Sequence, residues 1–214
     1  NVPVGDFARY WPAGWGTDAR AWVLANMSEG SMPRARASVE ARLGADGRFA
    51  LTALKGEMDI RDAAVNYLAP MPKARRVSGR ATFDATRFDI AIERAEAPGL
   101  AVTGGTIALT GLDQADQHAD IALVITGGFR AGLRLIEHPP LRFASGLGID
   151  PEGADGAAET NLRFRFILEH ALKAEQVEVK AAARLANVAL RGILLGQDLR
   201  QGNLALTLDR KGMD

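Results

Sequence analysis

The sequence predicts a mainly β protein: one long, curled, antiparallel sheet with a groove-like surface and two or three short helices. Apolar and polar residues alternate one by one in many short segments, for example over 88–93, 162–166 and 204–208. A period of two gives a strand one apolar face and one polar face. Gly and Asp separate these segments at short intervals, as hairpin connections do. Helical spacing is limited to short stretches, too little helix to cover about ten strands.

The first 34 residues predict an irregular lead-in and one helix. Tyr10 and Trp11 lie among Gly and Pro, which favours a partly buried, irregular segment. Thr17 is a good cap for a helix over 18–28, and Gly30 is a good stop. The helix has no cationic face, so we expect it to pack on a sheet end rather than on a membrane surface.

A first β half is predicted over 35–127. Asp46-Gly47 is a strong hairpin signal, and 62–69 predicts a short helical turn before Pro70. Gly104-Gly105 resembles a turn or bend. The predicted strands of this half cover 35–43, 49–60, 76–85, 87–95, 100–103, 106–112 and 120–126.

A helix and a second β half are predicted over 128–214. Gly127-Gly128 precedes a helix over 129–137, which Pro139-Pro140 ends. Turn-forming residues fill 141–156, and strands follow over 157–168, 176–185, 188–195 and 202–209. Residues 1–214 begin at Asn1 and end just after a strand-like run, so we expect one segment of a larger protein.

Composition narrows the function classes. Of the 214 residues, 47% are hydrophobic and 24% charged, which is typical of a folded domain. Lys plus Arg and Asp plus Glu both total 26, and this balance argues against a nucleic-acid partner. The absence of cysteine excludes disulfides and thiolate chemistry without identifying a compartment. No run approaches the ~18 apolar residues of a membrane span.

Isolated polar residues predict no enzyme, cofactor or metal site. His118, His138 and His170 form no His-x-x-x-His motif, and Ser145 lacks the glycines of a nucleophile elbow. Asp59 and Asp62 are expected to cap the next turn rather than perform acid–base chemistry. The densest polar cluster is expected to be a solvated turn rather than a calcium site: Asp113, Asp116, His118 and Asp120.

The apolar members of the alternating segments are the principal site candidates. Either they form a core beneath the helices, or they line a groove for something greasy. A small basic cluster, Lys73, Arg75 and Arg76, is either a solvated loop or a contact for anionic headgroups. The groove candidates are Phe88, Ile90, Ile92, Ile107, Leu109, Ile121, Leu123, Ile125, Leu162, Phe164, Phe166, Val177, Val179, Leu204, Leu206 and Leu208.

The order of short landmarks over about residues 10 to 209 resembles the central region of YhdP-type members of the AsmA-like superfamily. The landmarks are structural, and none is catalytic. They are Tyr10-Trp11-Pro12, Arg20 with Trp22-Val23 and Asn26, Asn66-Tyr67-Leu68, Pro70-Met71-Pro72, Gly79-Arg80, the helix from Gly127 to Pro139-Pro140-Leu141, and Asp150-Pro151 with Gly156.

This resemblance implies a segment of a periplasmic lipid-transfer protein, tethered to the inner membrane of a Gram-negative bacterium by an anchor outside residues 1–214. Its apolar β-groove would carry phospholipid acyl chains between the inner and outer membranes. The partners implied are phospholipid and adjoining segments of the same longer chain. The alternative is a structural or interaction module of a periplasmic scaffold with no ligand of its own.

Overall fold

A computed structural model describes residues 1–11, 17–44, 49–146, 148–168, 172, 176–194 and 197–210. Most of the described residues lie in strands. There are two helices of about three turns, and the other helical segments are single turns. In chain order the elements are β1 Val2–Pro3, η1 Val4–Asp6, α1 Phe7–Tyr10, α2 Thr17–Asn26, β2 Met27–Ser28, β3 Ser31–Leu43, β4 Phe49–Val65, β5 Ala74–Asp84, β6 Arg87–Ala97, β7 Leu100–Thr110, β8 His118–Gly128, α3 Phe129–Glu137, α4 Phe143–Gly146, η2 Pro151–Gly153, β9 Ala154–Ile167, β10 Glu178–Leu194 and β11 Gln197–Arg210.

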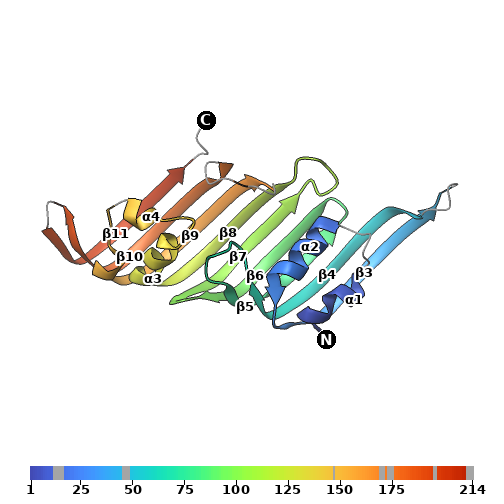
Figure 1. The fold of residues 1–214 in the computed structure, drawn as a ribbon, viewed down its shortest axis with the longest axis horizontal. Coiled ribbons are helices and arrows are strands. Elements are labelled where there is room, and N and C mark those ends of the chain that lie inside the picture. Colours follow the sequence, from blue (N-terminus) through green and yellow to red (C-terminus); the bar gives the residue numbers. More distant parts are fainter. Residues whose placement is uncertain are drawn as a thin grey trace.

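All strands join one antiparallel sheet that is not closed into a barrel. From β3 to β11 the strands lie in the sheet in the order in which they follow along the chain, while β1 adds to β3 and β2 pairs with β4 (Figure 1). This meander arises because short connections bring consecutive antiparallel strands side by side. The predicted fold class, a long antiparallel sheet with a few short helices, is therefore confirmed.

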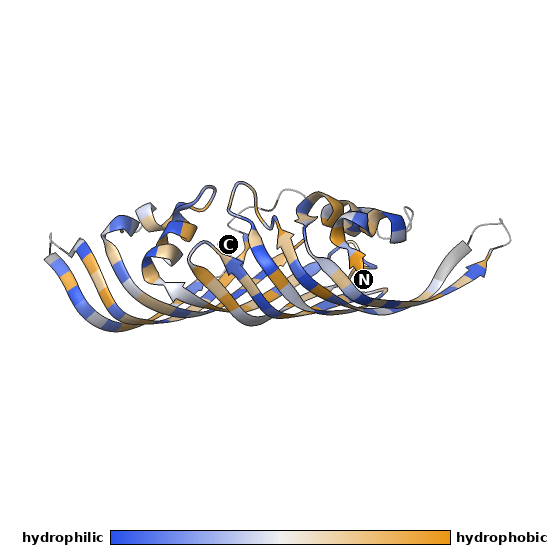
Figure 2. Ribbon diagram, turned by 90° about the horizontal axis from the view of Figure 1, so that it is seen from below, coloured by the Kyte–Doolittle hydropathy of each residue, from blue (hydrophilic) through white to orange (hydrophobic). Residues whose placement is uncertain are grey.

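The two longer helices lie on the same side of the sheet, which curves around them (Figure 2). We call the side that carries the helices the inner face and the opposite side the outer face. Consecutive strands meet at two edges. Turns 85–86 and 111–117 mark the hairpin edge, and segments 66–73, 98–99 and 129–153 mark the helix edge.

The small core of the molecule lies where α3 packs on the inner face. Leu133 of α3 is buried against Leu185, Val188 and Leu190 of β10, together with Ala144 of α4. The apolar residues of α3 share one side of the helix, as the sequence predicts for 129–137, and that side faces the sheet. By contrast, α2 has no buried residue among those described.

Several predicted boundaries are wrong for one shared reason. Residues 62–65 continue β4 instead of turning into a helix, 100–110 form one strand, and 178–194 form one strand. At each site the strand contains a register shift rather than a turn: between Ile60 and Ala63, between Val102 and Gly104, and between Ala186 and Ala189. A bulge and a turn share local sequence signals, so alternation alone does not separate them.

The N-terminal predictions need two smaller corrections. The lead-in before residue 12 is not irregular but forms β1, η1 and α1, where the rings of Phe7 and Trp11 meet edge-on at 5.2 Å. The helix ends at Asn26, and Met27–Ser28 form β2, so Thr17 begins the helix and its predicted end at residue 28 is too late. The Asp46-Gly47 hairpin signal lies outside the described residues.

Candidate functional site: an apolar inner face

The inner face is built from the alternating apolar residues singled out in the sequence. Strand pairing places Ile90 opposite Ile107, Ile107 opposite Ile121, and Ile121 opposite Phe164. Residues directly opposite in a sheet point to the same face. The same registers put every groove candidate within a strand on the inner face, and Val177 directly precedes β10.

These side chains form rows that run across the strands. Phe88, Leu109 and Phe166 belong to the first row, nearest the hairpin edge, with Ala119 between the last two. The second row includes Ile90, Ile107, Ile121, Phe164 and Val179; the third includes Ile92, Gly105, Leu123, Leu162, Ala181 and Leu208. A fourth row includes Ile125, Ala183 and Leu206, and a fifth includes Ala158, Leu185 and Leu204.

This apolar surface is only partly covered by protein. None of the groove candidates is fully buried: most are half-buried, while Leu206 and Leu208 at the edge strand are 50% and 55% exposed. The described residues of rows one and two that are fully buried are small: Ala81, opposite Ile90, and Ala119, opposite Leu109. The predicted alternative, a core sealed beneath the helices, holds for the part of the face under α3.

The total surface agrees with an uncovered face. The chain exposes 13742 Å². A compact monomer of 22.8 kDa exposes about 9,600 Å². The difference, about 4,100 Å², is what a single-layer sheet leaves in contact with solvent.

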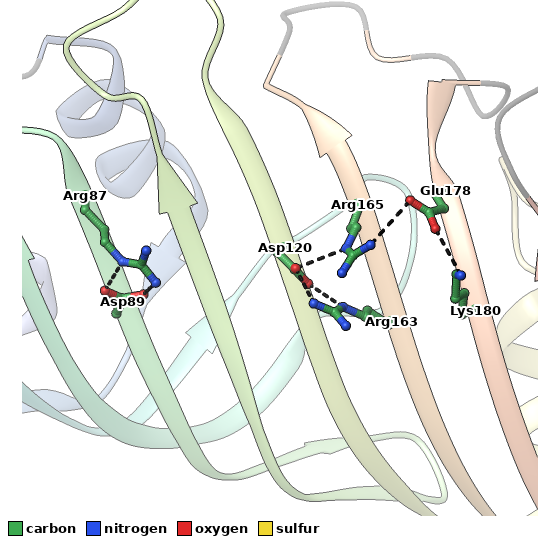
Figure 3. A network of polar contacts seen from close by, with 7 residues as sticks. All are labelled: Arg87, Asp89, Asp120, Arg163, Arg165, Glu178 and Lys180. Carbon is green, nitrogen blue, oxygen red and sulfur yellow. Dashed lines mark hydrogen bonds and ion pairs between the residues drawn. The ribbon is translucent and has the colours of Figure 1, made fainter.

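The outer face carries the charged members of the alternation. Asp120 of β8 accepts hydrogen bonds from Arg163 at 2.8 and 2.5 Å and from Arg165 at 3.1 Å, both on β9. Figure 3 shows how this cluster continues through Glu178 to Lys180 on β10, with contacts of 3.8 and 3.4 Å. Arg163 and Arg165 thus lie on the polar face that the alternation over 162–166 predicts for this strand.

Electrostatics at this face favours the ionised carboxylates. The hydrogen bond from Arg163 is the main cause that holds the pKa of Asp120 below its usual value, against a smaller effect of burial. The pKa of Asp59 on β4 is lowered chiefly by the hydrogen bond from Arg80 of β5, and Arg34 of β3 adds to it. Cross-strand pairs of this kind support one strand register.

The cap formed by α3, α4 and η2 is fastened to the sheet by polar contacts as well as by its core. Arg130 of α3 donates a hydrogen bond of 2.7 Å to the carbonyl oxygen of Ala154 on β9. Arg134 makes a bidentate contact of 2.7 and 2.5 Å with Glu152 of η2. Glu137 accepts a 2.8 Å hydrogen bond from the Ser145 amide, which lowers the pKa of its carboxyl.

The headgroup candidates lie at the helix edge, at the start of β5. Arg75 pairs with Glu29 at 2.9 Å, and Arg76 pairs with Glu96 at 3.4 Å. Lys73 is exposed just before the strand. Two of the three cations are thus already neutralised by carboxylates, which weakens the case for an anionic headgroup contact at this cluster.

The polar residues considered for chemistry lie apart. Asp120 belongs to the outer-face cluster and His118 begins β8, whereas Asp113 and Asp116 lie in the turn before it. Within the described ranges no group of three or more His, Asp and Glu side chains could hold a metal ion. His138 is exposed after α3, and His170 lies outside the described residues.

The capping prediction for Asp59 and Asp62 is wrong, because both residues lie inside β4. Asp59 pairs with Arg34 and Arg80, as described above. Asp62 lies at the bulge with a φ of 54° and accepts a 2.8 Å hydrogen bond from Arg94. No helix in the part of the chain that the structure describes is long and apolar enough to cross a bilayer.

The inner face also contains small residues that the sequence prediction omitted, because it considered only large apolar side chains. Gly79 pairs with Ile92 and Gly105 with Leu123, and Ala181 pairs with both Leu162 and Leu208. Their place in the alternation carries the signal, since each occupies the same parity as the large residues of its strand. They give the face a mixture of shallow and prominent positions.

Comparisons of this chain with family models, with curated proteins and with solved structures found no match.

Proposed function

We propose that this chain is a segment of an envelope lipid-transfer protein whose inner face carries phospholipid acyl chains between the inner and outer membranes. The observation that carries the proposal is the row structure of the inner face. Half-buried Leu, Ile, Phe and Val side chains continue from strand to strand across β6 to β10 and face away from the charged side. Exposed apolar surface of this extent is typical of binding surfaces.

Hydrocarbon is a suitable occupant of this face on energetic grounds. Removing one methylene from water contributes about 0.8 kcal/mol, so a tail of ~16 methylenes gains about 13 kcal/mol. A lipid in a bilayer already has this stabilisation. A surface that only matches the bilayer therefore lets a tail move along it, while a hydrated headgroup stays at the open side.

The envelope part of the proposal depends on the resemblance to AsmA-like proteins. It includes a periplasmic location, a tether to the inner membrane outside residues 1–214, and adjoining segments of a longer chain as partners. The proposed role is passive and needs no cofactor, metal or catalytic residue.

Substitutions to Asp on the inner face test the proposal. We expect Ile90→Asp, Leu123→Asp and Phe164→Asp, made singly, to reduce photo-crosslinking to phospholipid by about tenfold, because a charge in contact with a tail removes 1.5–3 kcal/mol or more of apolar contact. The measurement is the yield of protein crosslinked to a phospholipid that carries a photoactivatable group in its tail. Ala91→Asp is the matched control, since Ala91 adjoins Ile90 in sequence but is exposed on the outer face opposite Arg80.

The control variant should retain the crosslinking of the parent chain. If the three inner-face variants fold, as judged by circular dichroism, and still crosslink as well as the parent, then these positions do not contact lipid. The alternative, a scaffold module, would then be favoured, with the edges of the sheet as its docking sites.

A further inference from the structure

The cap over the inner face divides it into two strips that differ in cover. Ala183 of the fourth row and Leu185 and Leu204 of the fifth pack against the core beneath α3. Leu133, Phe129 and Ile136 of the helix belong to the same apolar cluster. On β9 to β11, the apolar surface of the strip near the helix edge is therefore already covered by α3.

The second strip comprises rows one to three and is not included in the core beneath α3. Its residues on β6 to β9, such as Ile90, Ile107, Leu123 and Leu162, are half-buried. Phe83 and Phe88 stack with ring centroids 5.7 Å apart in the first row, beside the hairpin edge. We call this strip the open lane. The rings of Phe83 and Phe88 border it near the hairpin edge, and α3 borders it on the opposite side at β8 to β10.

The open lane has dimensions that suit lipid tails. Rows two residues apart along a strand are separated by about 6.7 Å, so the first and third rows lie about 13 Å apart. Carbon atoms in contact lie about 4 Å apart, which leaves room for two tails side by side. From β5 to β10 the lane extends about 24 Å, and one leaflet contributes only about 15 Å to the hydrocarbon core of a bilayer.

We propose that α3 acts as a wall that confines acyl chains to the open lane, so that rows one to three contact lipid and rows four and five beneath α3 do not. This inference rests on the proposed function and specifies the part of the inner face that performs it. Gly127 and Gly128 lead into α3, and the Arg134–Glu152 contact holds the cap in place. The wall is thus a fixed part of the fold, positioned over one side of the path.

The role of α3 can be tested by replacing single residues with a photo-crosslinking amino acid that carries an aliphatic diazirine. Leu123 of the open lane and Leu204 beneath α3 make a matched pair, because both are half-buried leucines on the inner face. The chain would be mixed with vesicles of phosphatidylethanolamine and phosphatidylglycerol and irradiated. Intact-protein mass spectrometry then measures the fraction of chain that carries a lipid adduct. We expect lipid adducts at Leu123 to exceed those at Leu204 by about tenfold. The same residue at Ala122, on the outer face, should give no adduct.

The outcomes separate this inference from the proposed function. Equal adducts at Leu123 and Leu204 would overturn the wall and leave the lipid path intact. No adduct at either position, or equal adducts at Ala122, would overturn both. A Leu133→Ala variant adds a second readout: loosening α3 should raise the adduct yield at Leu204 several-fold and leave that at Leu123 unchanged. Failure of Leu204 to respond would contradict the role given to α3.

Discussion

Asp120 is the residue on which the outer-face cluster converges. Its carboxylate accepts hydrogen bonds from Arg163 and Arg165, and the side chain is 35% exposed. Exposed ion pairs contribute little individually, but a carboxylate shared by two guanidinium groups with good geometry contributes more. The cluster ties β8 to β9 on the face opposite the proposed lipid path, and so supports the inner face without touching it.

Acid titration checks this role. The lowered pKa of Asp120 means that its contribution to stability is present above its ordinary value of 3.8 and is lost as pH falls through the folded-state value. We expect Asp120→Asn to lower the free energy of unfolding by about 1 kcal/mol at pH 7. The difference from the parent chain should shrink below about pH 4.

Urea unfolding at several pH values measures this effect. Asp113→Asn removes the same charge from an exposed position in the 111–117 turn and is the control. An equal loss of stability in both variants, or a difference that persists at pH 2, would show that the arginine contacts of Asp120 are not responsible.

At the scale of one strand, β7 contains two adjacent glycines with different surroundings. A Cβ built on Gly105 would overlap the carbonyl oxygen of Ala122 and approach Leu123 Cδ2 to 2.8 Å. A Cβ on Gly104 would come no closer than 4.0 Å to any atom, the carbonyl oxygen of Ile92. Gly105 thus permits the close approach of β8 that accompanies the bend of the sheet.

This contrast predicts a large loss of stability at one glycine and almost none at the other for the same substitution to Ala. Gly105→Ala should lower the free energy of unfolding by about 1–3 kcal/mol, because the backbone of β8 must move away. Gly104→Ala should change it by less than about 0.5 kcal/mol, since space is available and the unfolded chain loses freedom. Urea denaturation of the two variants provides the measurement. Equal stability of both variants would remove Gly105 as a determinant of strand approach.

The strands also show how far sequence reasoning extends. Alternation predicted the strand faces well, because a residue such as Ile90 or Leu123 must share a face with its neighbours two positions away. Alternation failed at Asp62 and Asn187, where the sequence predicts a turn and a gap between strands. In the structure both residues lie within strands and have a positive φ, 54° and 53°. Only pairing with a strand distant in sequence shows that β4 and β10 continue past these points. The division of the inner face by α3 depends on tertiary packing and left no local signal.

At the scale of the whole molecule, the open sheet should be sensitive to apolar ligands. Its exposed surface exceeds that of a compact monomer by about 4,100 Å², and apolar side chains of the inner face contribute to it. Such a fold has few contacts between layers outside the α3 core. Its stability is therefore expected to depend on what covers the inner face.

Binding of a short-tailed phosphatidylcholine below its micellar concentration should raise the unfolding temperature. A ligand that binds only the folded state at 100 times its dissociation constant contributes about 2.7 kcal/mol, or about 5–10 °C for a chain of this size. Glycerophosphocholine, which has the headgroup and no tails, should cause no shift. Ile90→Asp should reduce the shift, while Ala91→Asp on the outer face should retain it. A shift of the same size with the headgroup alone would mean that polar contacts, rather than the apolar rows, bind the ligand.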